Sequence, residues 1–541
     1  MDFKENQTLQ KLRGGYYTPS DIASYIAKWV SKKNPSKILE PSCGDGAFIK
    51  AIAPYSEGVS LSAFEIDPLE ASKALEKSKL GSFKKTEVRD IDFLEWSLSK
   101  VLSRQESFDA VIGNPPFIRY QFLPENFQEH SERIFDALGC RFTKHTNAWV
   151  PFILASIALL KPGGRLGMVV PSEIIHVMHA QSLRTFLGSE CKRLVIIDPQ
   201  ELWFEDTLQG AVILMAEKAH EGEYREGLAI RSVVGRQFLN EDPEMMFQSG
   251  AAINGKTISG KWTNALLGIS AMGLLDALDD DPNFCRFNDA AEVAVGIVTG
   301  ANKFFLVSDE TVEKYELSNW AHPMFGRSDH CPGILYNEKQ HLHNAQHGKP
   351  TNFIWFEDDA VETHPVAKKY IELGESDDLH KRYKCRIREN WYAVPSVYSA
   401  PIGMLKRAHD TPRLISNEIK AYTTDTAYRV KPRSISSDKL VYGFHNPLTA
   451  LSAELEGRHY GGGVLELVPS EIRKLRLPDM AKLNPDLVKL DSDIRVLDTE
   501  VMLEMQGDKV LEPLGVSVSD RLELLTAWDR LRKRRQRVDA P

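Results

Sequence analysis

Short apolar runs alternate with longer helical patterns along the first 220 residues of the chain. Each run is bounded by glycine, proline or acidic residues, which is typical of a buried strand followed by a turn. Strands that alternate with helices predict an α/β fold with a mostly parallel sheet, whose ligand binds at the carboxyl ends of the strands. The expected strands lie within 36–53, 59–68, 86–96, 108–117, 164–173, 192–199 and 211–218, with a long helix through 149–160.

The pattern changes beyond residue 225. Residues 226–290 show little regular pattern apart from one helical segment, so we expect a linker or insert there. A new unit is expected over 291–480, because its first twenty residues alternate as β-strands do. Residues 481–541 carry apolar positions at helical spacing and end in a basic amphipathic helix, "LLTAWDRLRKRRQR", which we expect to pack on the preceding unit. The first part, 1–225, is the α/β domain.

The composition is that of an ordinary globular protein, with 42% hydrophobic and 26% charged residues. The length of 541 residues is too great for one compact core, so several domains are expected. No apolar run is long enough to span a membrane, and the polar start lacks the apolar core of a secretory signal, so we expect a cytoplasmic location. The six cysteines lack paired spacing, and Cys331 with its four nearby histidines matches no standard zinc pattern, so we expect no metal site.

The charge is unevenly distributed along the chain. A net charge of −8 argues against a nucleic-acid partner, yet residues 380–433 hold twelve Lys and Arg against four acids, with aromatic residues interleaved. A positive surface with aromatics is what a phosphate backbone and unstacked bases favour. The alternative is a solvated face balanced by acids elsewhere in the fold. The side chains suited to phosphates, base edges or stacking are Lys303, Arg386, Arg388, Trp391, Lys406 and Arg407.

The segment "SKILEPSCGDGAFIKAIA" reads as strand, glycine turn and helix. Glu65 follows at the tip of the second strand, where a carboxylate can accept hydrogen bonds from both hydroxyls of a ribose. Asp92 and Phe93, after the third strand, suit an adenine ring. The loop lacks the third glycine of a dinucleotide fingerprint, and Asp45 is an awkward neighbour for a pyrophosphate. S-adenosylmethionine has no phosphate and carries a cationic sulfonium, so these carboxylates, with Glu40, favour it as the cofactor.

A second motif, "FDAVIGNPPF", places an asparagine, two prolines and an aromatic directly after an expected strand. The prolines hold the turn in one shape, which indicates a rigid rim that presents Asn114 and Phe117. The side-chain oxygen of Asn114 and the carbonyl of Pro115 can each accept a hydrogen from an exocyclic amine. These bonds strengthen as positive charge builds on the amine nitrogen. The motif is therefore suited to hold such an amine between two acceptors, with Phe117 as a stacking face.

In order and spacing, "ILEPSCGDGAFI", "FEIDP", "DFLEW" and "GNPPF" resemble the motifs of gamma-class adenine-N6 DNA methyltransferases, the Taq-type enzymes of bacterial type II restriction–modification. The segment "GGYYTPSDIASYI" resembles the motif that closes over the methionine end of the cofactor in that family. The resemblance implies a class I S-adenosylmethionine-dependent methyltransferase fold, Rossmann-like, followed by an α+β DNA target-recognition domain and a helical C-terminus. Together with the glycine loop, it assigns cofactor binding to Tyr17, Thr18, Glu40, Pro41, Ser42, Gly44, Gly46, Glu65, Ile66, Asp92, Phe93 and Pro116.

The same resemblance implies that the target adenine is flipped out of the duplex into the site. The later segment "ELWFEDTLQGAVILMAEK" resembles the motif that supplies a second aromatic for the base. That role is assigned to Phe204, and the adjacent Trp203 is the alternative. The expected catalytic residues are Asn114, Pro115, Pro116, Phe117 and Phe204.

Double-stranded DNA is therefore the expected partner of a monomer or simple dimer, with cleavage left to a separate restriction endonuclease acting on the same site. Segments 291–310 and 382–396 resemble parts of the target-recognition region of type II modification methylases. The Asn-Pro-Pro-aromatic motif also serves RNA exocyclic-amine and protein-glutamine methyltransferases, which are the alternative functions. A degenerate, DNA-binding subunit without activity is a further alternative, but it would be expected to have lost Asn114 or Glu65, and both are present.

Overall fold

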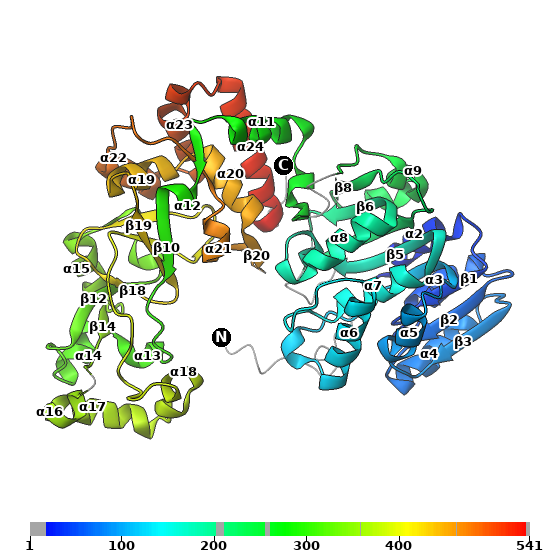
Figure 1. The fold of residues 1–541 in the computed structure, drawn as a ribbon, viewed down its shortest axis with the longest axis horizontal. Coiled ribbons are helices and arrows are strands. Elements are labelled where there is room, and N and C mark those ends of the chain that lie inside the picture. Colours follow the sequence, from blue (N-terminus) through cyan, green and yellow to red (C-terminus); the bar gives the residue numbers. More distant parts are fainter. Residues whose placement is uncertain (1–17, 202–209, 255–259, 358, 461, 537–541) are drawn as a thin grey trace. The chain divides into compact units, whose positions relative to one another are not determined.

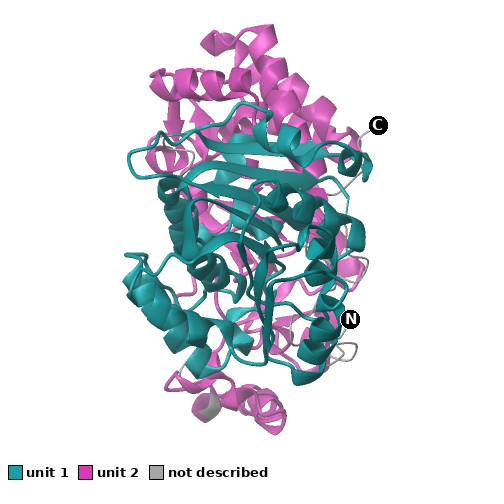
Figure 2. Cartoon of the chain, turned by 90° about the vertical axis from the view of Figure 1, so that its right-hand side faces the viewer, with its two compact units in different colours: residues 1–266, 537–541 teal, residues 267–536 magenta. Residues whose placement is uncertain are grey.

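The computed structural model describes residues 18–201, 210–254, 260–357, 359–460 and 462–536. The chain forms two compact units, residues 1–266 with 537–541 and residues 267–536 (Figure 2). The first unit thus extends beyond the predicted boundary at 225/226. Within the described residues, no helix is both long and apolar enough to cross a membrane.

The first unit is built on a sheet whose eight described strands run in the order β3-β2-β1-β4-β5-β7-β6-β8 (Figure 1). Neighbours from β3 to β5 are parallel, β7 lies antiparallel between β5 and β6, and β8 is parallel to β6. The predicted α/β fold with a mostly parallel sheet is confirmed. The strands are β1 (Lys37–Glu40), β2 (Ser60–Phe64), β3 (Lys85–Arg89), β4 (Phe108–Gly113), β5 (Leu160–Pro171), β6 (Cys191–Pro199), β7 (Ala211–Lys218) and β8 (Gly227–Val233).

Helices cover both faces of this sheet and enclose one hydrophobic core on each side. Neighbouring residues of a strand point to opposite faces, so Leu39 packs in one core and Ile38 in the other. The first core includes residues of α5, α6, α7 and α8, and the second includes residues of α2, α3, α4 and α9. The helices are α2 (Ser20–Ser31), α3 (Ala47–Ile52), α4 (Pro68–Ser78), α5 (Phe93–Leu102), α6 (Glu125–Ala137), α7 (Trp149–Leu159), α8 (Gln181–Glu190) and α9 (Pro243–Gln248).

The segment after residue 225 belongs to this unit instead of linking it to the next. Strand β8 extends the sheet beside β6, and α9 is held by two buried arginines. Arg165 donates to Glu244 at 2.7 Å and 3.0 Å, and Arg193 donates to the carbonyl of Phe247 at 2.7 Å. The linker prediction was wrong here because Arg231 and Ser232 interrupt the apolar alternation of β8, so the strand resembles a polar connection.

The second unit combines several small sheets with helices (Figure 1). Its largest described sheet has the order β10-β19-β15-β17-β13, and smaller ones have the orders β11-β14-β12-β18, β16-β21-β20 and β22-β9. The strands are β9 (Phe284–Arg286), β10 (Ala291–Val295), β11 (Leu306–Val307), β12 (Ala321–Phe325), β13 (Leu335–Tyr336), β14 (Asn352–Ile354), β15 (Ile402–Leu405), β16 (Arg407–Ala408), β17 (Leu414–Asn417), β18 (Tyr422–Thr423), β19 (Ala427–Pro432), β20 (Arg458–Tyr460), β21 (Val464–Glu466) and β22 (Arg476–Pro478).

Helices of the second unit surround these sheets and form its C-terminal part, as the spacing of apolar residues predicts. They are α11 (Ile269–Asp280), α12 (Phe287–Ala290), α13 (Asn302–Phe305), α14 (Asp309–Lys314), α15 (Glu338–Gln346), α16 (Ala360–Thr363), α17 (Pro365–Ser376), α18 (Tyr383–Arg386), α19 (Ser437–Phe444), α20 (Pro447–Glu456), α21 (Pro469–Ile472), α22 (Leu487–Val496), α23 (Thr499–Val510) and α24 (Val518–Gln536).

The last helix, α24, packs on α20, and a buried ion pair joins the two helices. Arg535 donates to Glu454 at 2.7 Å and 3.0 Å, and both side chains are fully buried. Burial opposes the ionisation of Glu454, but Arg535 and His459 outweigh it, so the pKa of Glu454 is lowered. The basic C-terminal helix is therefore docked within its unit, although one of its arginines serves the core.

Candidate active site

Three adjacent parallel strands bring Glu40, Glu65 and Asn114 to the same edge of the first sheet. Strand β1 ends at Glu40 and pairs with β2 on one side and β4 on the other. Glu65 and Asn114 directly follow β2 and β4. The ends of β1 and β4 approach closely, since a Cβ on Gly113 would lie 3.4 Å from a ring carbon of Pro41. The residues expected to hold cofactor and substrate thus share one edge.

The loop after β1 is fixed across these strand ends by three hydrogen bonds. The backbone N–H of Cys43 donates to the carbonyl of Phe64 at 2.8 Å, and that of Gly44 donates to Oε2 of Glu65 at 2.9 Å. Ser42 Oγ donates to the backbone carbonyl of Asn114 at 2.9 Å. The loop therefore joins the turn after β2 to the turn after β4, which makes this edge a preorganised surface.

The two glycines of the loop have different structural roles. Both have positive φ, +51° for Gly44 and +86° for Gly46, which favours glycine. A Cβ on Gly46 would lie 2.8 Å from Cα of Ala74, so this glycine lets the loop pack against α4. Nothing described lies within 4 Å of a Cβ on Gly44. Gly46 is thus required by packing, and Gly44 leaves open space on the loop.

Glu40 is a buried carboxylate with an unusual environment. It is 0% exposed, and neither of its oxygens has a hydrogen-bond partner within the described residues. Burial raises the pKa of Glu40 well above its ordinary value, and the nearby charges of Asp45 and Glu65 raise it further. Lys77 opposes the shift and pairs with Asp45 at 2.7 Å. A buried carboxylate without a partner is costly, and a cation bound beside it would relieve that cost.

Glu65 is half-buried and, unlike Glu40, has hydrogen-bond partners among the described residues. Its two oxygens accept from the backbone N–H groups of Asp67 and Gly44, each at 2.9 Å. Burial raises the pKa of Glu65 although these hydrogen bonds oppose the shift. Its side chain is therefore oriented by the loop, in a position that can accept from a further polyol ligand.

Asn114 is linked to the segment that begins the described chain. Its Nδ2 donates to Oγ1 of Thr18 at 3.2 Å, and Thr18 is buried just before α2. The hydrogen bond holds the amide in one orientation and places the expected cofactor motif beside the expected catalytic motif. Pro115 is buried, while Pro116 and Phe117 are half-buried, and Phe117 packs against both cores. Tyr17, Trp203 and Phe204 lie outside the described residues.

Asp92 and Phe93, which are expected to contact an adenine ring, also have contacts within the fold. Asp92 caps α5 by accepting from the backbone of Leu94 at 2.7 Å. Phe93 is buried in the core, where its ring centroid lies 5.4 Å from that of Phe152. In contrast, Ile66 is 70% exposed. The cofactor roles of these residues stay predictions, and the structure gives Asp92 and Phe93 a structural role as well.

Ile91 is a candidate for contact with the adenine ring that the sequence analysis did not identify. It is 42% exposed and lies two residues beyond Arg89, which pairs with Phe64 in the sheet. Ile66 lies two residues beyond Phe64, so two exposed apolar side chains follow adjacent strand ends. The available signal was an isoleucine between two aspartates in "RDIDF", where no core position is expected.

In the second unit, the predicted DNA-binding residues fall into two groups. Lys303 on α13 and Arg386 on α18 are exposed. Arg388 is half-buried and donates to the carbonyl of Val298 at 2.7 Å, which ties the segment after α18 to the turn before α13. Burial lowers the pKa of Arg388. Arg388 thus has a structural role that sequence reasoning did not foresee.

Lys406 and Arg407 form the other group, next to the small sheet β16-β21-β20. Lys406 lies 3.3 Å from Glu466, and Arg407 donates to the same carboxylate at 2.7 Å. Glu466 is buried and pairs with both cations, so it offsets part of their positive charge. The two cations are therefore less available to phosphates than the sequence suggests.

The prediction that Trp391 stacks on a base is wrong for this structure. The side chain is 8% exposed and packs in an aromatic cluster, 5.1 Å from the ring centroid of Phe304. Its Nε1 donates to Glu375 at 3.2 Å. The indole fills the space above Gly374, where a Cβ would lie 2.4 Å from the ring. Trp391 is a core residue of the second unit, because its neighbours in space bury it.

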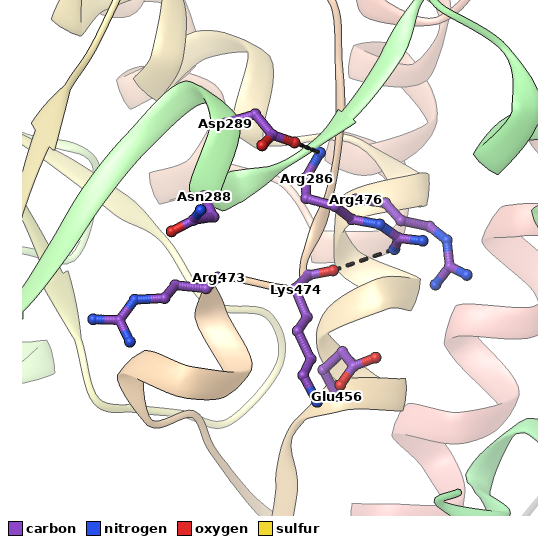
Figure 3. A pocket seen from close by; sticks show the side chains of 7 residues that line it. All are labelled: Arg286, Asn288, Asp289, Glu456, Arg473, Lys474 and Arg476. Atoms are coloured by element: carbon purple, nitrogen blue, oxygen red, sulfur yellow. Dashed lines mark hydrogen bonds between the residues drawn. The ribbon is translucent and has the colours of Figure 1, made fainter.

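A cavity of about 450 Å³ lies elsewhere in the second unit (Figure 3). Its cationic side chains do not converge, since Arg473 and Arg476 extend to opposite sides in this view. Arg286 and Arg476 both pair with Asp279, at 2.8 Å and 2.7 Å. The cavity therefore lacks the arrangement of an anion site. It is lined by Arg286, Asn288, Asp289, Glu456, Arg473, Lys474 and Arg476.

Within the described residues, no three His, Cys, Asp or Glu side chains are grouped so that they could hold a metal ion. The histidine-rich segment that begins at Cys331 contains helix α15. His330 is buried, which lowers its pKa to about 4, and Cys331 is buried as well. These side chains belong to the interior of the second unit.

The first unit is thus an α/β domain with a mostly parallel sheet, and its candidate site lies at one edge of that sheet. Two family models match the chain. Eco57I restriction-modification methylase matches residues 49–204, and Type II methyltransferase M.Eco57I, C-terminal domain, matches residues 259–511. The chain is therefore similar to restriction–modification methyltransferases over both matched segments.

Relatives that match most of the chain carry the same description. Type II methyltransferase M.AccI of Acinetobacter calcoaceticus is 22% identical over 532 residues, which cover 95% of this chain and 94% of the relative. Type II methyltransferase M.XamI of Xanthomonas campestris pv. amaranthicola is 22% identical over 490 residues, covering 87% and 86%. Among solved structures, the type IIG restriction endonuclease BpuSI matches with 13% identity and a TM-score of 0.43, over 97% of this chain and 66% of that chain.

Proposed function

We propose that the chain is a site-specific DNA methyltransferase that transfers a methyl group from S-adenosylmethionine to N6 of adenine. The observation that supports this most directly is the position of Asn114 at the end of β4, hydrogen-bonded to Thr18 and to Ser42 beside the buried Glu40. The motif Asn-Pro-Pro-Phe is thereby held at a sheet edge where a buried carboxyl favours a cation. The type II relatives support DNA as the substrate.

The residues at the sheet edge fit S-adenosylmethionine. When bound, this cofactor supplies an electrophilic methyl group on a sulfonium. Glu40 provides a buried carboxyl without a hydrogen-bond partner among the described residues, and a cationic ligand would stabilise its ionised form; Glu65 provides acceptors for ribose hydroxyls. Gly44 leaves open space for close approach, and Ile66 offers an apolar surface for the adenine ring. The remaining expected cofactor residues keep their assignment in this proposal.

Asn114 and Pro115 act on the amine that receives the methyl group. The lone pair of an adenine N6 amine is delocalised into the ring, so the free amine is a poor nucleophile. The side-chain oxygen of Asn114 and the carbonyl of Pro115 each accept one N6 hydrogen, which favours a tetrahedral nitrogen and directs its lone pair to the methyl group. These bonds strengthen as positive charge develops, so they bind the transition state better than the substrate.

An adenine within a duplex cannot reach this edge, so the proposal requires that the base is flipped out. Phe117, half-buried beside Asn114, provides one stacking face, and Phe204 is proposed for the other. The second unit reads the DNA sequence, with Lys303 and Arg386 as exposed phosphate contacts. The chain works as a monomer or simple dimer in the cytoplasm, as the modification component of a restriction–modification system beside a separate endonuclease.

Nucleoside analysis tests this proposal. Purified protein is incubated with S-adenosylmethionine carrying a labelled methyl group and with unmethylated bacterial DNA, RNA or total protein in separate reactions. The DNA is then digested to nucleosides. Label in N6-methyldeoxyadenosine is the expected result. Label in a methylated cytosine would contradict the proposed target atom, and label only in RNA or in a protein glutamine would favour the alternative substrates.

A further inference from the structure

The segment 381–388, which we call the α18 ridge, presents an aromatic ring among cations on the surface of the second unit. Tyr383 is 64% exposed and Ile387 is 60% exposed. Lys384 Nζ lies 5.6 Å from the ring centroid of Tyr383, and Arg386 Cζ lies 5.7 Å from it. An exposed aromatic ring held beside two cations offers a face that a ligand can cover.

Buried contacts on the inner side of the α18 ridge hold its backbone, and the exposed side chains project from the other side. Cys385 is fully buried and faces the turn at Gly300, where a Cβ would lie 2.8 Å from Cβ of Lys384 and 3.1 Å from Sγ of Cys385. Gly300 has a φ of +80°. Arg388 completes the attachment by donating to the carbonyls of Val298 and Trp391 at 2.7 Å and 3.1 Å. The backbone under Tyr383 is therefore preorganised.

The ridge is also strongly positive. Residues 378–389 contain five Lys and Arg and two acids, a net charge of +3. Lys381 pairs with Asp378 at 2.7 Å. Arg382, Lys384 and Arg386 form no ion pair within the part of the chain that the structure describes, so their charges are available to a partner. Cations of this kind attract phosphates, and an aromatic face between them suits a base.

We propose that Tyr383 is the aromatic residue of the second unit that contacts a base of the recognised DNA sequence, and that Lys384 and Arg386 bind the phosphates beside it. This inference rests on the proposed function, and it assigns to Tyr383 the contact that sequence reasoning gave to Trp391. The exposed ring is buried against a base in the complex. The flanking cations hold the ring in place and contribute affinity that does not depend on sequence.

Duplex binding by matched variants tests the proposal. The full-length protein is compared with Tyr383→Ala, Tyr383→Phe and Arg386→Ala, and with Tyr224→Ala as the control, because Tyr224 is also an exposed tyrosine and lies in the first unit. The probes are short labelled duplexes that carry either the motif methylated by the wild-type protein in a host or a scrambled version. Dissociation constants are measured over a series of salt concentrations, and thermal unfolding is recorded for each variant.

Tyr383→Ala is expected to weaken binding to the motif duplex roughly 5- to 150-fold, with a much smaller effect on the scrambled duplex and an unchanged salt slope. Tyr383→Phe retains the stacking surface and should bind like the wild type. Arg386→Ala should weaken binding to both duplexes and reduce the salt slope by about 0.9, the value for one phosphate contact. The Tyr224 control should match the wild type.

The proposal is overturned if Tyr383→Ala binds the motif duplex as tightly as the Tyr224 control. It is also overturned if Tyr383→Ala weakens binding to both duplexes equally and unfolds at a lower temperature, since the residue would then serve the fold. If the wild-type protein methylates DNA and Tyr383→Ala binds the motif duplex normally, this inference is wrong and the proposed function stands. A wild-type protein that methylates no DNA removes the proposed function, and the inference with it.

Discussion

Replacing Glu40 with glutamine distinguishes an effect on cofactor affinity from an effect on the stability of the fold. The substitution keeps the shape of the side chain and removes an ionisable carboxyl that is fully buried and has no hydrogen-bond partner in the described structure. A charge-assisted hydrogen bond contributes about 1.5–3 kcal/mol, and full burial leaves little screening. The dissociation constant for S-adenosylmethionine should therefore rise roughly 10- to 150-fold in Glu40→Gln.

The pH dependence of binding should change in the same variant. Burial raises the pKa of Glu40, so without cofactor its carboxyl keeps a proton at a pH where an ordinary glutamate is ionised. A bound cation favours the carboxylate, so binding releases this proton, and affinity should increase as the pH rises through the raised pKa. Glu40→Gln should lose this part of the pH dependence. Isothermal titration calorimetry in buffers of different ionisation enthalpy measures the proton release directly.

The same substitution should have the opposite effect on the stability of the protein without cofactor. A carboxyl whose pKa is raised in the folded protein makes the fold less stable as pH rises above the unfolded value, so Glu40→Gln without cofactor should unfold at the same or a higher temperature than the wild type at neutral pH. Glu57→Gln, an exposed carboxyl of the same unit, is the control and should change neither property. Unchanged affinity in Glu40→Gln would refute the reasoning, and a lower unfolding temperature would show that the carboxyl is structural.

Four further substitutions test packing and the buried ion pair. Gly46→Ala should destabilise the first unit by about 2–4 kcal/mol, because Gly46 has a positive φ and contacts the α4 backbone. Gly44→Ala should cost about 1–2 kcal/mol of stability and mainly weaken cofactor binding. Denaturant melts measure the loss of stability, and calorimetry measures the affinity for the cofactor. Arg535→Ala leaves the buried Glu454 with His459 but without its arginine partner, so the apparent melting temperature should fall by roughly 6–20 °C, and a change no larger than that of exposed Arg530→Ala would contradict the buried ion pair. Trp391→Ala should cost about 3–5 kcal/mol of stability in thermal unfolding, which a surface stacking residue would not.

The sequence predicts the first unit well because its signals are local. Apolar runs define the strands, and the polar residues directly after them meet at one edge because the strands are parallel. Glu40, Glu65 and Asn114 could therefore be placed together without coordinates. Strand β8 was missed because Arg231 and Ser232 break its pattern, and their place in the sheet depends on pairing with β6.

The second unit shows what a sequence cannot supply. Tyr383 and Trp391 lie eight positions apart in the same basic segment, with similar neighbours along the chain. Their burial is opposite because Gly374 and Phe304, distant in sequence, enclose Trp391, while Cys385 turns α18 so that Tyr383 faces solvent. Likewise, Glu466 neutralises part of the charge of Lys406 and Arg407 from another strand. Surface chemistry of this kind depends on tertiary contacts.

The central claim is that Asn114 directs methyl transfer to adenine N6. The most direct measurement expresses the wild-type protein and Asn114→Ala in a bacterial host without DNA methylation, and sequences the genomic DNA by a method that detects N6-methyladenine. The account predicts one short motif modified throughout the genome by the wild type. Because the lost bonds act in the transition state, Asn114→Ala should be at least about 100-fold slower and leave the motif unmodified, while its affinity for S-adenosylmethionine is retained. An unmodified genome with intact wild-type protein, or full modification by Asn114→Ala, would contradict the account.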